Sequence, residues 1–454
     1  MADPAGVLRQ RRRRALSPCP TSPPHTVEAA TMTKINVFVF AAHHLSGNIA
    51  AQRFKGLLKY LDPAKYRIFV FARGTATGTG TTRSATGNVT IFALPGHCVG
   101  SESSAAASLL TLASAFLRPL PLLLGNSSGQ RRPWLVQALA KADRLCAEKR
   151  ATGERCAVIG TYSPIDALVA AASLASRHRI GCMQDFRDGL VYEPLGRPGR
   201  LHALARQMVE RRVVAPATLI SSVSRPLVDD FQRRYPHKTT INLPNGFDPE
   251  DFASPADSSG SARQAAAILA RHVPPGAQLI GHFGRIGASD GSASDSLDYL
   301  IDALNDSADA TAGRHLMFVG ELTPRERTSI ERARFSVSVL EPVERALALQ
   351  LMKRCDTLLL LTGSRTSCAT GKLFEYLAAG AAIVCISAVP NEATAILGET
   401  GAGRTLLTST TTGAAALRAA LSPPAADARR DVSAYSRVAQ AGALDRWISQ
   451  MVTA

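Results

Sequence analysis

The sequence predicts an α/β protein with two doubly wound lobes, and three observations support this. Short apolar runs typical of buried strands alternate with segments of helical periodicity along most of the chain. This alternation favours parallel sheets with helices on both faces. A length of 454 residues suits two domains of about 200 residues each. The content of 46% hydrophobic and 19% charged residues is typical of a soluble globular protein.

Residues 1–31 differ from the rest of the chain and are expected to be a disordered basic tail. They hold five arginines in 9–14 and several prolines, and they lack apolar periodicity. A targeting presequence is an alternative, although the prolines disfavour an amphipathic helix. Another is a translation start placed too far upstream, because Met32 directly precedes the first core strand.

The first lobe is expected over residues 32–235, with six strands and six helices. The strands are expected at 34–40, 67–72, 89–94, 156–160, 179–184 and 217–222, and the helices near 47–61, 103–117, 134–149, 164–177, 199–214 and 226–234. The Gly/Thr/Ala run around Gly78 is expected to be a loop. In the apolar window 105–124, Arg118-Pro-Leu-Pro121 interrupts any membrane span, so this segment is expected to be a core helix or one that touches a membrane interface.

The second lobe is expected over residues 236–425, followed by a terminal helical segment at 426–454. Its strands are expected at 278–283, 315–319, 335–339, 356–361 and 382–386, and its helices near 261–270, 295–307, 324–333, 343–353, 371–379 and 391–397. Helical spacing continues over 427–452.

The segment Thr370-Gly-Lys-Leu-Phe-Glu-Tyr-Leu-Ala-Ala-Gly380 has the chemistry of a nucleotide-diphosphate site. Thr370 is the expected N-cap, which leaves the N–H groups of Gly371, Lys372 and Leu373 facing an anion. The helix dipole and the Lys372 ammonium add to this attraction. Glu375, one turn later, suits a ribose diol. The apolar run 356–362 places this helix beyond the carboxyl end of a strand, where open α/β sheets bind ligands.

Four segments, in the same order, resemble those of glycosyltransferase family 4. They are Leu243-Pro-Asn-Gly-Phe-Asp248, Gly281-His-Phe-Gly-Arg285, Leu340-Glu-Pro-Val-Glu344 and the helix start at 370–380. The resemblance implies the GT-B fold, in which two Rossmann-like domains face each other across a cleft. It also implies that the terminal helix crosses back to the first lobe.

The resemblance also assigns donor-binding residues in the second lobe. It implies that Asn245 and Gly284 lie at the donor site, that Arg285 contacts the diphosphate, and that Glu341 and Val343 lie near the base. Two positions depart from the family pattern. The lysine usually found about five residues after the arginine is missing, and Lys372 is the candidate substitute. The first of the family's paired glutamates falls on Ser367.

Two loops of the first lobe are candidates for the site, with Gly47 and Asn48 expected at the donor and His44 on the acceptor side. The loop 41–48 contains His44, Gly47 and Asn48, and the resemblance implies that its glycine faces the donor phosphates. The alternative is a simple turn and N-cap. Arg53 is expected either to contact phosphate or to be solvated.

In the tetrad Asp185-Phe-Arg-Asp188, charges follow a strand, so Asp185, Arg187 and Asp188 are candidate acceptor-site or catalytic groups. An internal ion pair of Arg187 with Asp185 or Asp188 is the alternative.

The expected activity is transfer of a sugar from a nucleotide diphosphate-sugar to a hydroxyl of a glycan or lipid-linked acceptor, with retention as the resemblance implies. No metal and no cofactor is expected. The net charge of +16 and the scattered cysteines suggest a cytoplasmic protein that can contact an anionic membrane. Nucleic-acid binding is not expected, because no basic motif is interleaved with aromatic residues. A GT-B sugar-nucleotide epimerase and a non-catalytic nucleotide- or nucleic-acid-binding protein are the alternatives.

Overall fold

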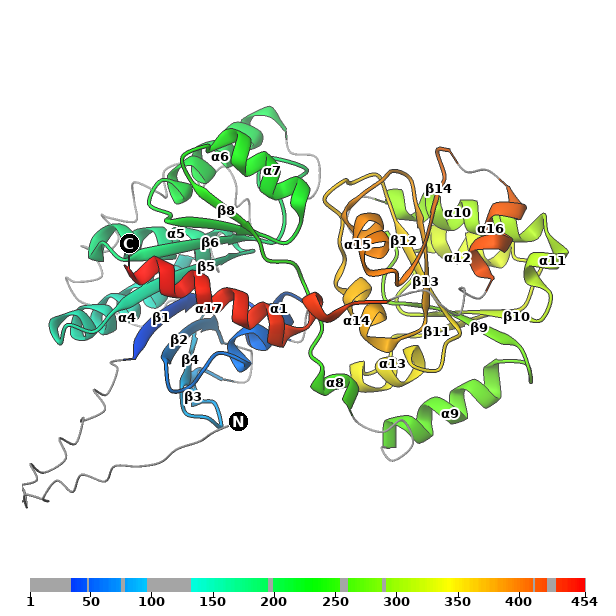
Figure 1. The fold of residues 1–454 in the computed structure, drawn as a ribbon, viewed down its shortest axis with the longest axis horizontal. Coiled ribbons are helices and arrows are strands. Elements are labelled where there is room, and N and C mark those ends of the chain that lie inside the picture. The colour runs from blue at the N-terminus through cyan, green and yellow to red at the C-terminus, as the bar shows by residue number, and fades with distance from the viewer. Residues whose placement is uncertain are drawn as a thin grey trace, which may run out of the picture. The chain divides into compact units, whose positions relative to one another are not determined.

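Two mainly parallel sheets organise the chain, one in each lobe (Figure 1). The first has eight strands in the order β3-β4-β2-β1-β5-β6-β7-β8, and the second has six in the order β11-β10-β9-β12-β13-β14. Only the β3–β4 pair is antiparallel among the described strands. The expected fold class of two doubly wound α/β lobes is confirmed.

The computed structural model describes residues 34–46, 49–74, 78–95, 132–194, 199–253, 260–287, 291–410, 413–422 and 430–453. Several expectations lie outside these ranges: the tail at 1–31, the apolar window 105–124 with its helix, and the loop residues Gly47 and Asn48. None of the helices in the described ranges is long and apolar enough to cross a membrane.

The strands of the first sheet are apolar where they are central and polar at the edges. β1, with the sequence INVFVF, is buried along its whole length between β2 and β5. The edge strand β3, with the sequence GTTR, is exposed throughout. The strands are β1 Ile35–Phe40, β2 Tyr66–Arg73, β3 Gly80–Arg83, β4 Val89–Leu94, β5 Cys156–Tyr162, β6 Gly181–Phe186, β7 Leu219–Ser222 and β8 Thr239–Asn242.

Two of these strands differ from expectation. β3 forms where a loop was expected, because its backbone pairs with β4 even though its side chains are polar. β8 pairs in parallel with β7, so the first sheet continues beyond the boundary expected at residue 235.

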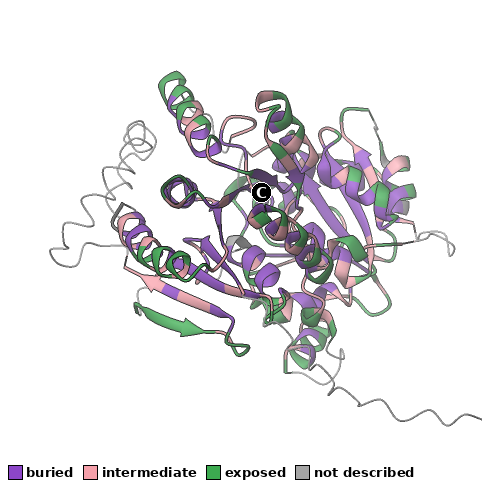
Figure 2. Ribbon diagram, turned by 60° about the vertical axis from the view of Figure 1, so that its left-hand side comes forward, coloured by how far each residue is buried: buried purple, intermediate pink, exposed green. Residues whose placement is uncertain are grey.

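Helices of the first lobe cover both faces of this sheet, with one apolar core on each face. Figure 2 shows buried strands flanked by helices whose outward faces are exposed. The helices are α1 Ile49–Lys59, α4 Arg132–Ala151, α5 Ile165–His178, α6 Arg200–Val214 and α7 Arg225–Arg234.

The second lobe repeats this plan around β9, β10 and β12, again with a core on each face of the sheet. Its strands are β9 Gln278–Phe283, β10 Arg314–Val319, β11 Val337–Leu340, β12 Thr357–Thr362, β13 Ala382–Ser387 and β14 Gly403–Leu407. Its helices are α8 Glu250–Ala253, α9 Gly260–His272, α10 Ser292–Asn305, α11 Ala308–Thr311, α12 Pro324–Glu331, α13 Arg345–Met352, α14 Gly371–Ala379, α15 Glu392–Thr400 and α16 Ala414–Leu421. The edge strand β14 was not expected.

The terminal helix α17 (Arg437–Thr453) follows a short 3₁₀ turn, η2 (Ser433–Tyr435), and packs on the first lobe. Its start is marked by the Ser436 hydroxyl, which accepts a hydrogen bond from the N–H of Ala439 at 3.2 Å. Leu444 and Ile448 are fully buried in the core that β1 and α1 also form. Figure 1 shows α17 in red along α1.

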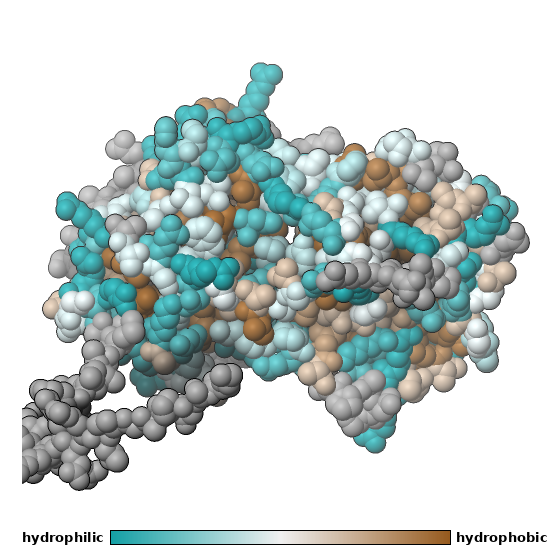
Figure 3. All heavy atoms as spheres, in the orientation of Figure 1, coloured by the Kyte–Doolittle hydropathy of each residue, from teal (hydrophilic) through white to brown (hydrophobic). Residues whose placement is uncertain are grey.

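Two connections cross between the lobes side by side. Phe247 pairs with Ser436 as an isolated parallel bridge, its N–H donates to the carbonyl of Tyr435, and its carbonyl accepts from the N–H of Arg437. Both sheets therefore belong to one compact unit over residues 34–454. On the face shown in Figure 3, hydrophilic side chains are spread over both lobes and interspersed with apolar ones.

Side chains also join the lobes beyond these connections. The Glu193 carboxylate accepts four hydrogen bonds of 2.7–2.9 Å from the backbone N–H and hydroxyl groups of Thr366 and Ser367. Although burial raises the pKa of Glu193, these donors hold it below its ordinary value. Arg225 of α7 pairs with Glu392 of α15 at 3.2 Å.

Candidate functional site

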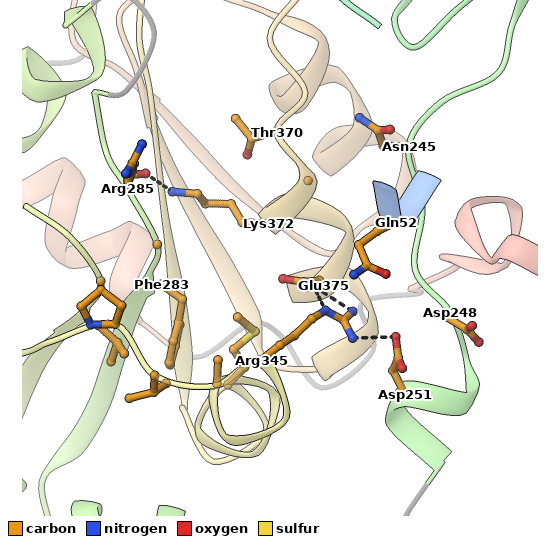
Figure 4. A pocket seen from close by; sticks show the side chains of 18 of the residues that line it. Gln52, Asn245, Asp248, Asp251, Phe283, Arg285, Arg345, Thr370, Lys372 and Glu375 are labelled. Carbon is orange, nitrogen blue, oxygen red and sulfur yellow. Dashed lines mark hydrogen bonds and ion pairs between the residues drawn. The ribbon is translucent and has the colours of Figure 1, made fainter. Parts of the chain in front are cut away.

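A cavity of about 700 Å³ lies between the lobes (Figure 4). On the first-lobe side it is lined by α1 and the 245–248 loop, and on the second-lobe side by the carboxyl ends of β9 and β10, the start of α13 and the N-terminus of α14. Parallel strands end at the same sheet edge, so the N-termini of the following helices meet there. The cavity therefore lies where the sequence predicts a ligand site.

Helix α14 presents its N-terminus to this cavity through Thr370, Gly371 and Lys372. Thr370 has the extended backbone of an N-cap, but its side chain makes no capping bond, and its buried Oγ1 has no partner within the described chain. The N–H groups of Gly371 and Lys372 have no acceptor within their own helix, as in any first turn.

One expectation for this helix is wrong. The N–H of Leu373 donates to the Thr370 carbonyl at 3.1 Å, and the Leu373 side chain is buried in the core. Leu373 therefore does not face a ligand.

Lys372 is held over the end of β9. Its Nζ donates to the carbonyl of Arg285 at 2.5 Å and lies 3.3 Å from Nε2 of His282. Nδ1 of this buried histidine lies 2.9 Å from the Leu359 carbonyl, which only accepts. A proton on Nδ1 satisfies this carbonyl, and in that tautomer Nε2 is an acceptor for Lys372. Burial lowers the pKa of Lys372 to about 8.

Arg285 lies at the rim of the cavity with a 65% exposed side chain, paired with Glu321 through Nε at 2.9 Å. Gly284 before it has φ +81°, and Gly320 lies so close that a Cβ there would come within 2.9 Å of the Gly284 backbone. These two glycines let the loops after β9 and β10 touch, which brings Arg285 to the cavity.

Glu375 points into the cavity and is held by Arg345, whose Nε and Nη2 lie 3.1 and 3.0 Å from Oε1 (Figure 4). Nη1 of Arg345 also binds Asp251 at 2.9 Å. Burial raises the pKa of Glu375, while Arg345 opposes the shift. Arg345 and Asp251 are not among the site residues predicted from the sequence. The only local signal for Arg345 is its position, because it is a charged residue at the start of the helix that follows the 340–344 motif.

Three further residues expected at the donor site, Glu341, Val343 and Asn245, differ in their surroundings. Val343 lines the cavity, whereas Glu341 is 76% exposed and pairs with Arg327 at 3.1 Å. Asn245 also lines the cavity, and its carbonyl accepts from Gln440 of α17 at 2.9 Å.

Asp185 does not reach the large cavity. It is fully buried and pairs with Arg53 at 2.7 Å, and its carboxylate also accepts from Thr161 and Ser221 at 2.8 Å. Both expectations for Arg53, a contact with phosphate and a solvated side chain, are wrong, because its buried guanidinium pairs with Asp185. The Arg53 guanidinium therefore neutralises the carboxylate of Asp185 near the end of β6, and no ligand is needed to do so.

His44 and Arg187 line a second cavity of about 10 Å³, the size of one water. His44 is buried, its Nδ1 has no partner in the described part of the chain, and burial lowers its pKa to about 4. Arg187 donates to the Tyr162 carbonyl at 3.0 Å and lies 3.6 Å from Asp188, which agrees with the internal ion pair. Asp188 does not line either cavity. Within the described residues, no group of three or more His, Cys, Asp or Glu side chains is placed to hold a metal ion.

Solved structures of similar architecture match nearly the whole chain. A UDP-forming α,α-trehalose-phosphate synthase from Burkholderia vietnamiensis matches with a TM-score of 0.55 at 15% identity, over 93% of this chain and 100% of that one. A sucrose-phosphate synthase from Thermosynechococcus elongatus matches with a TM-score of 0.53 at 14% identity, over 92% and 95%. The chain has the GT-B fold.

A glycosyltransferase from Rickettsia africae matches this GT-B fold with a TM-score of 0.53 at 8% identity, over 92% of this chain and 98% of that one. No family model matches the chain, and no curated protein matches it in sequence. The likeness at these identities is one of fold, and the resemblance to family 4 rests on the sequence motifs.

Proposed function

We propose that the protein is a glycosyltransferase, resembling family 4, that moves a sugar from a nucleotide diphosphate-sugar to an acceptor hydroxyl with retention. The observation that carries the proposal is the convergence of the free N-terminus of α14, Lys372 and Glu375 on one cavity at the carboxyl ends of β9 and β12. An anion-binding helix start and a carboxylate one turn later match a diphosphate and a ribose.

The leaving diphosphate would be stabilised by the N–H groups of Gly371 and Lys372 and by the Lys372 ammonium. Such preorganised donors commonly supply the largest share of rate enhancement. Arg285 would exchange Glu321 for the phosphate, which its exposed side chain allows. The acceptor oxygen attacks the anomeric carbon from the leaving-group face, the bond from that carbon to the diphosphate breaks, and the hydroxyl proton passes to a diphosphate oxygen. Neither a metal nor a cofactor takes part in this scheme.

Glu375 would bind the ribose through Oε2, because Arg345 already occupies Oε1. Arg345 therefore acts as a positioning residue that fixes the carboxylate. Backbone groups at Pro342 and Val343 would contact the base, since both residues line the same cavity.

For the acceptor we propose a glycan or lipid-linked hydroxyl, in the assembly of surface polysaccharide or glycolipid at the inner face of the membrane. The net charge of +16 supports contact with an anionic surface.

A melting-temperature screen against UDP-, GDP- and ADP-sugars tests the donor site, because a ligand at 100 times its Kd stabilises by about 2.7 kcal/mol. Calorimetry then measures the affinity for the nucleotide that gives the largest melting-temperature shift. Glu375→Gln and Lys372→Ala are compared with Arg263→Gln, a control at an exposed position on α9. We expect Glu375→Gln to weaken binding by about 1.5–3 kcal/mol and Lys372→Ala to lower turnover about 10²–10³-fold.

Unchanged binding and turnover in both variants would leave α14 as scaffold and contradict the proposal. Release of an altered sugar without transfer to an acceptor would indicate an epimerase instead. Turnover that persists in the presence of a chelator is also expected, and an absolute need for Mn²⁺ or Mg²⁺ would contradict the proposed mechanism.

A further inference from the structure

Arg437, the first residue of α17, is a buried cation that lines the large cavity. It is only 4% exposed. Its Nη1 donates to Gln440 at 2.7 Å, and its Nε and Nη2 have no hydrogen-bond partner within the described residues. A Cβ on Gly56 of α1 would come within 2.9 Å of the Arg437 side chain, so only a glycine at this position lets the side chain lie against α1.

No carboxylate among the described residues lies within ion-pair distance of Arg437, unlike the other buried arginine nearby. Arg53 has Asp185 at 2.7 Å. Burial, reinforced by the charge of Arg53, lowers the pKa of Arg437 to about 9, and the carboxylates of Asp248 and Asp185, which form no ion pair with it, only partly oppose this shift. A buried charge without a counter-ion is unfavourable, and a cavity beside it is the place for an anion to enter.

Lys55 supplies a second uncompensated cation on the same side of the cavity. It precedes Gly56 on α1, is exposed, lines the cavity and forms no ion pair with any described residue. Lys59, one turn further along, is instead neutralised by Asp248 at 2.8 Å and Glu250 at 2.7 Å. We call Lys55, Gly56 and Arg437 the α1–α17 wall.

The cavity thus has two cationic regions on different walls. One is the α14 N-terminus with Lys372 in the second lobe, and the other is the α1–α17 wall. The α14 N-terminus with Lys372 is enough to bind the diphosphate of the donor. The proposed reaction therefore provides no anionic group for the α1–α17 wall.

We propose that the α1–α17 wall binds a phosphate group carried by the acceptor. This inference rests on the proposed function, because it takes the α14 region to hold the donor diphosphate. Arg437 binds the phosphate through its Nε and Nη2, and Lys55 adds a charge from the open side. The shared chemistry is a phosphate ester, supplied by a soluble sugar phosphate or by a phospholipid-linked acceptor.

The test uses the full-length protein saturated with the nucleoside diphosphate that gives the largest melting-temperature shift. Glucose 6-phosphate and inorganic phosphate are titrated by calorimetry, and vesicles of phosphatidic acid with phosphatidylcholine are compared with phosphatidylcholine alone. The variants are Lys55→Gln, Arg437→Gln and Arg437→Lys. Arg263→Gln is the control with the same change in charge.

We expect Lys55→Gln and Arg437→Gln each to weaken binding of the phosphate probe about 10- to 100-fold, and Arg437→Lys to retain part of it. Arg263→Gln should bind the phosphate probe as the wild type does. The affinity for the nucleoside diphosphate should be unchanged in all of these variants. Preference for glucose 6-phosphate identifies a soluble acceptor, and preference for the phosphatidic acid vesicles a lipid-linked one. If Arg437→Gln does not fold, Lys55→Gln carries the test, because its side chain is exposed.

Wild-type protein that binds none of the phosphate probes, or equal binding in all variants, would overturn the inference. So would a loss of nucleotide affinity in Lys55→Gln, because the wall would then belong to the donor. Failure of the wild type to bind any nucleotide contradicts the proposed function instead, and the two failures are thereby distinguished.

Discussion

Lys372 has a pKa of about 8, which places its charge change close to neutral pH. Binding of a nucleoside diphosphate should therefore weaken as the pH rises from 7 to 9, because the free protein loses the ammonium in that range. Titration of Kd against pH checks this. Lys372→Arg should give a flatter profile, since arginine stays charged. Equal slopes in the two proteins would show that Lys372 does not contact the phosphates.

The same shift has a consequence for stability. Because the folded pKa lies below the ordinary value near 10.5, the unfolded chain binds more protons between about pH 8 and 10.5. The contribution of Lys372 to the free energy of unfolding therefore rises with pH over this interval.

Asp185 gives a second prediction at the scale of single residues. Asp185→Asn leaves Arg53 buried without its counter-ion, so the free energy of unfolding should fall by about 3–5 kcal/mol. Urea unfolding measures the loss. Asp188→Asn is the matched control, because Asp188 forms a partly exposed pair with Arg187 at 3.6 Å. Loss of that pair should lower the free energy of unfolding by less than about 1 kcal/mol. Similar losses in the two variants would argue against the special role of the buried pair.

The sequence identifies the site residues that lie on one local segment and misses those that depend on packing. Lys372 and Glu375 follow from the spacing at one helix start, and both line the cavity. Arg345, which holds Glu375, comes from α13, and Asp251, which binds Arg345, comes from α8. Arg53 reaches Asp185 across 132 residues. Such pairs form only when distant elements pack, so no local pattern indicates them.

At the scale of elements, α17 completes the core of the first lobe. Leu444 is fully buried beside residues of β1 and α1, so Leu444→Ala should lower the free energy of unfolding by about 2–5 kcal/mol. Val438→Ala on the same helix is the control, because Val438 is 51% exposed. Thermal and urea unfolding of both variants provide the measurement. A loss for Leu444→Ala no larger than the control would show that the helix adds little to this core.

The central strands could be predicted from sequence, and several edge strands could not. β1 and β12 are buried along their whole length and are mostly apolar. β3, β8 and β14 lie at sheet edges, where one neighbour suffices, and their sequences GTTR, TTIN and GRTLL show no such run. Backbone pairing with a neighbour defines them, and a single sequence does not reveal that pairing.

At the scale of the whole molecule, Glu193 holds the two lobes together through its bonds to Thr366 and Ser367. Glu193→Gln replaces charge-assisted acceptors by a neutral amide, so the separated arrangement of the lobes should become more populated. Small-angle scattering should then give a larger radius of gyration, which a saturating nucleoside diphosphate reduces.

Glu154→Gln is the control for this test, because Glu154 pairs with Arg67 and Lys149 within the first lobe. A radius unchanged in Glu193→Gln would show that the remaining contacts hold the lobes together on their own.

The bridge between Phe247 and Ser436 brings the two ends of the second lobe side by side. In topological terms the second lobe is an insertion into the first. The first lobe is complete only when the chain returns to it as α17. A gene fragment for residues 247–436 therefore encodes a continuous lobe with adjoining termini, whereas the first lobe can be made alone only by joining β8 to α17 with a short linker. Production of each piece separately would show whether nucleotide recognition belongs to the inserted lobe by itself.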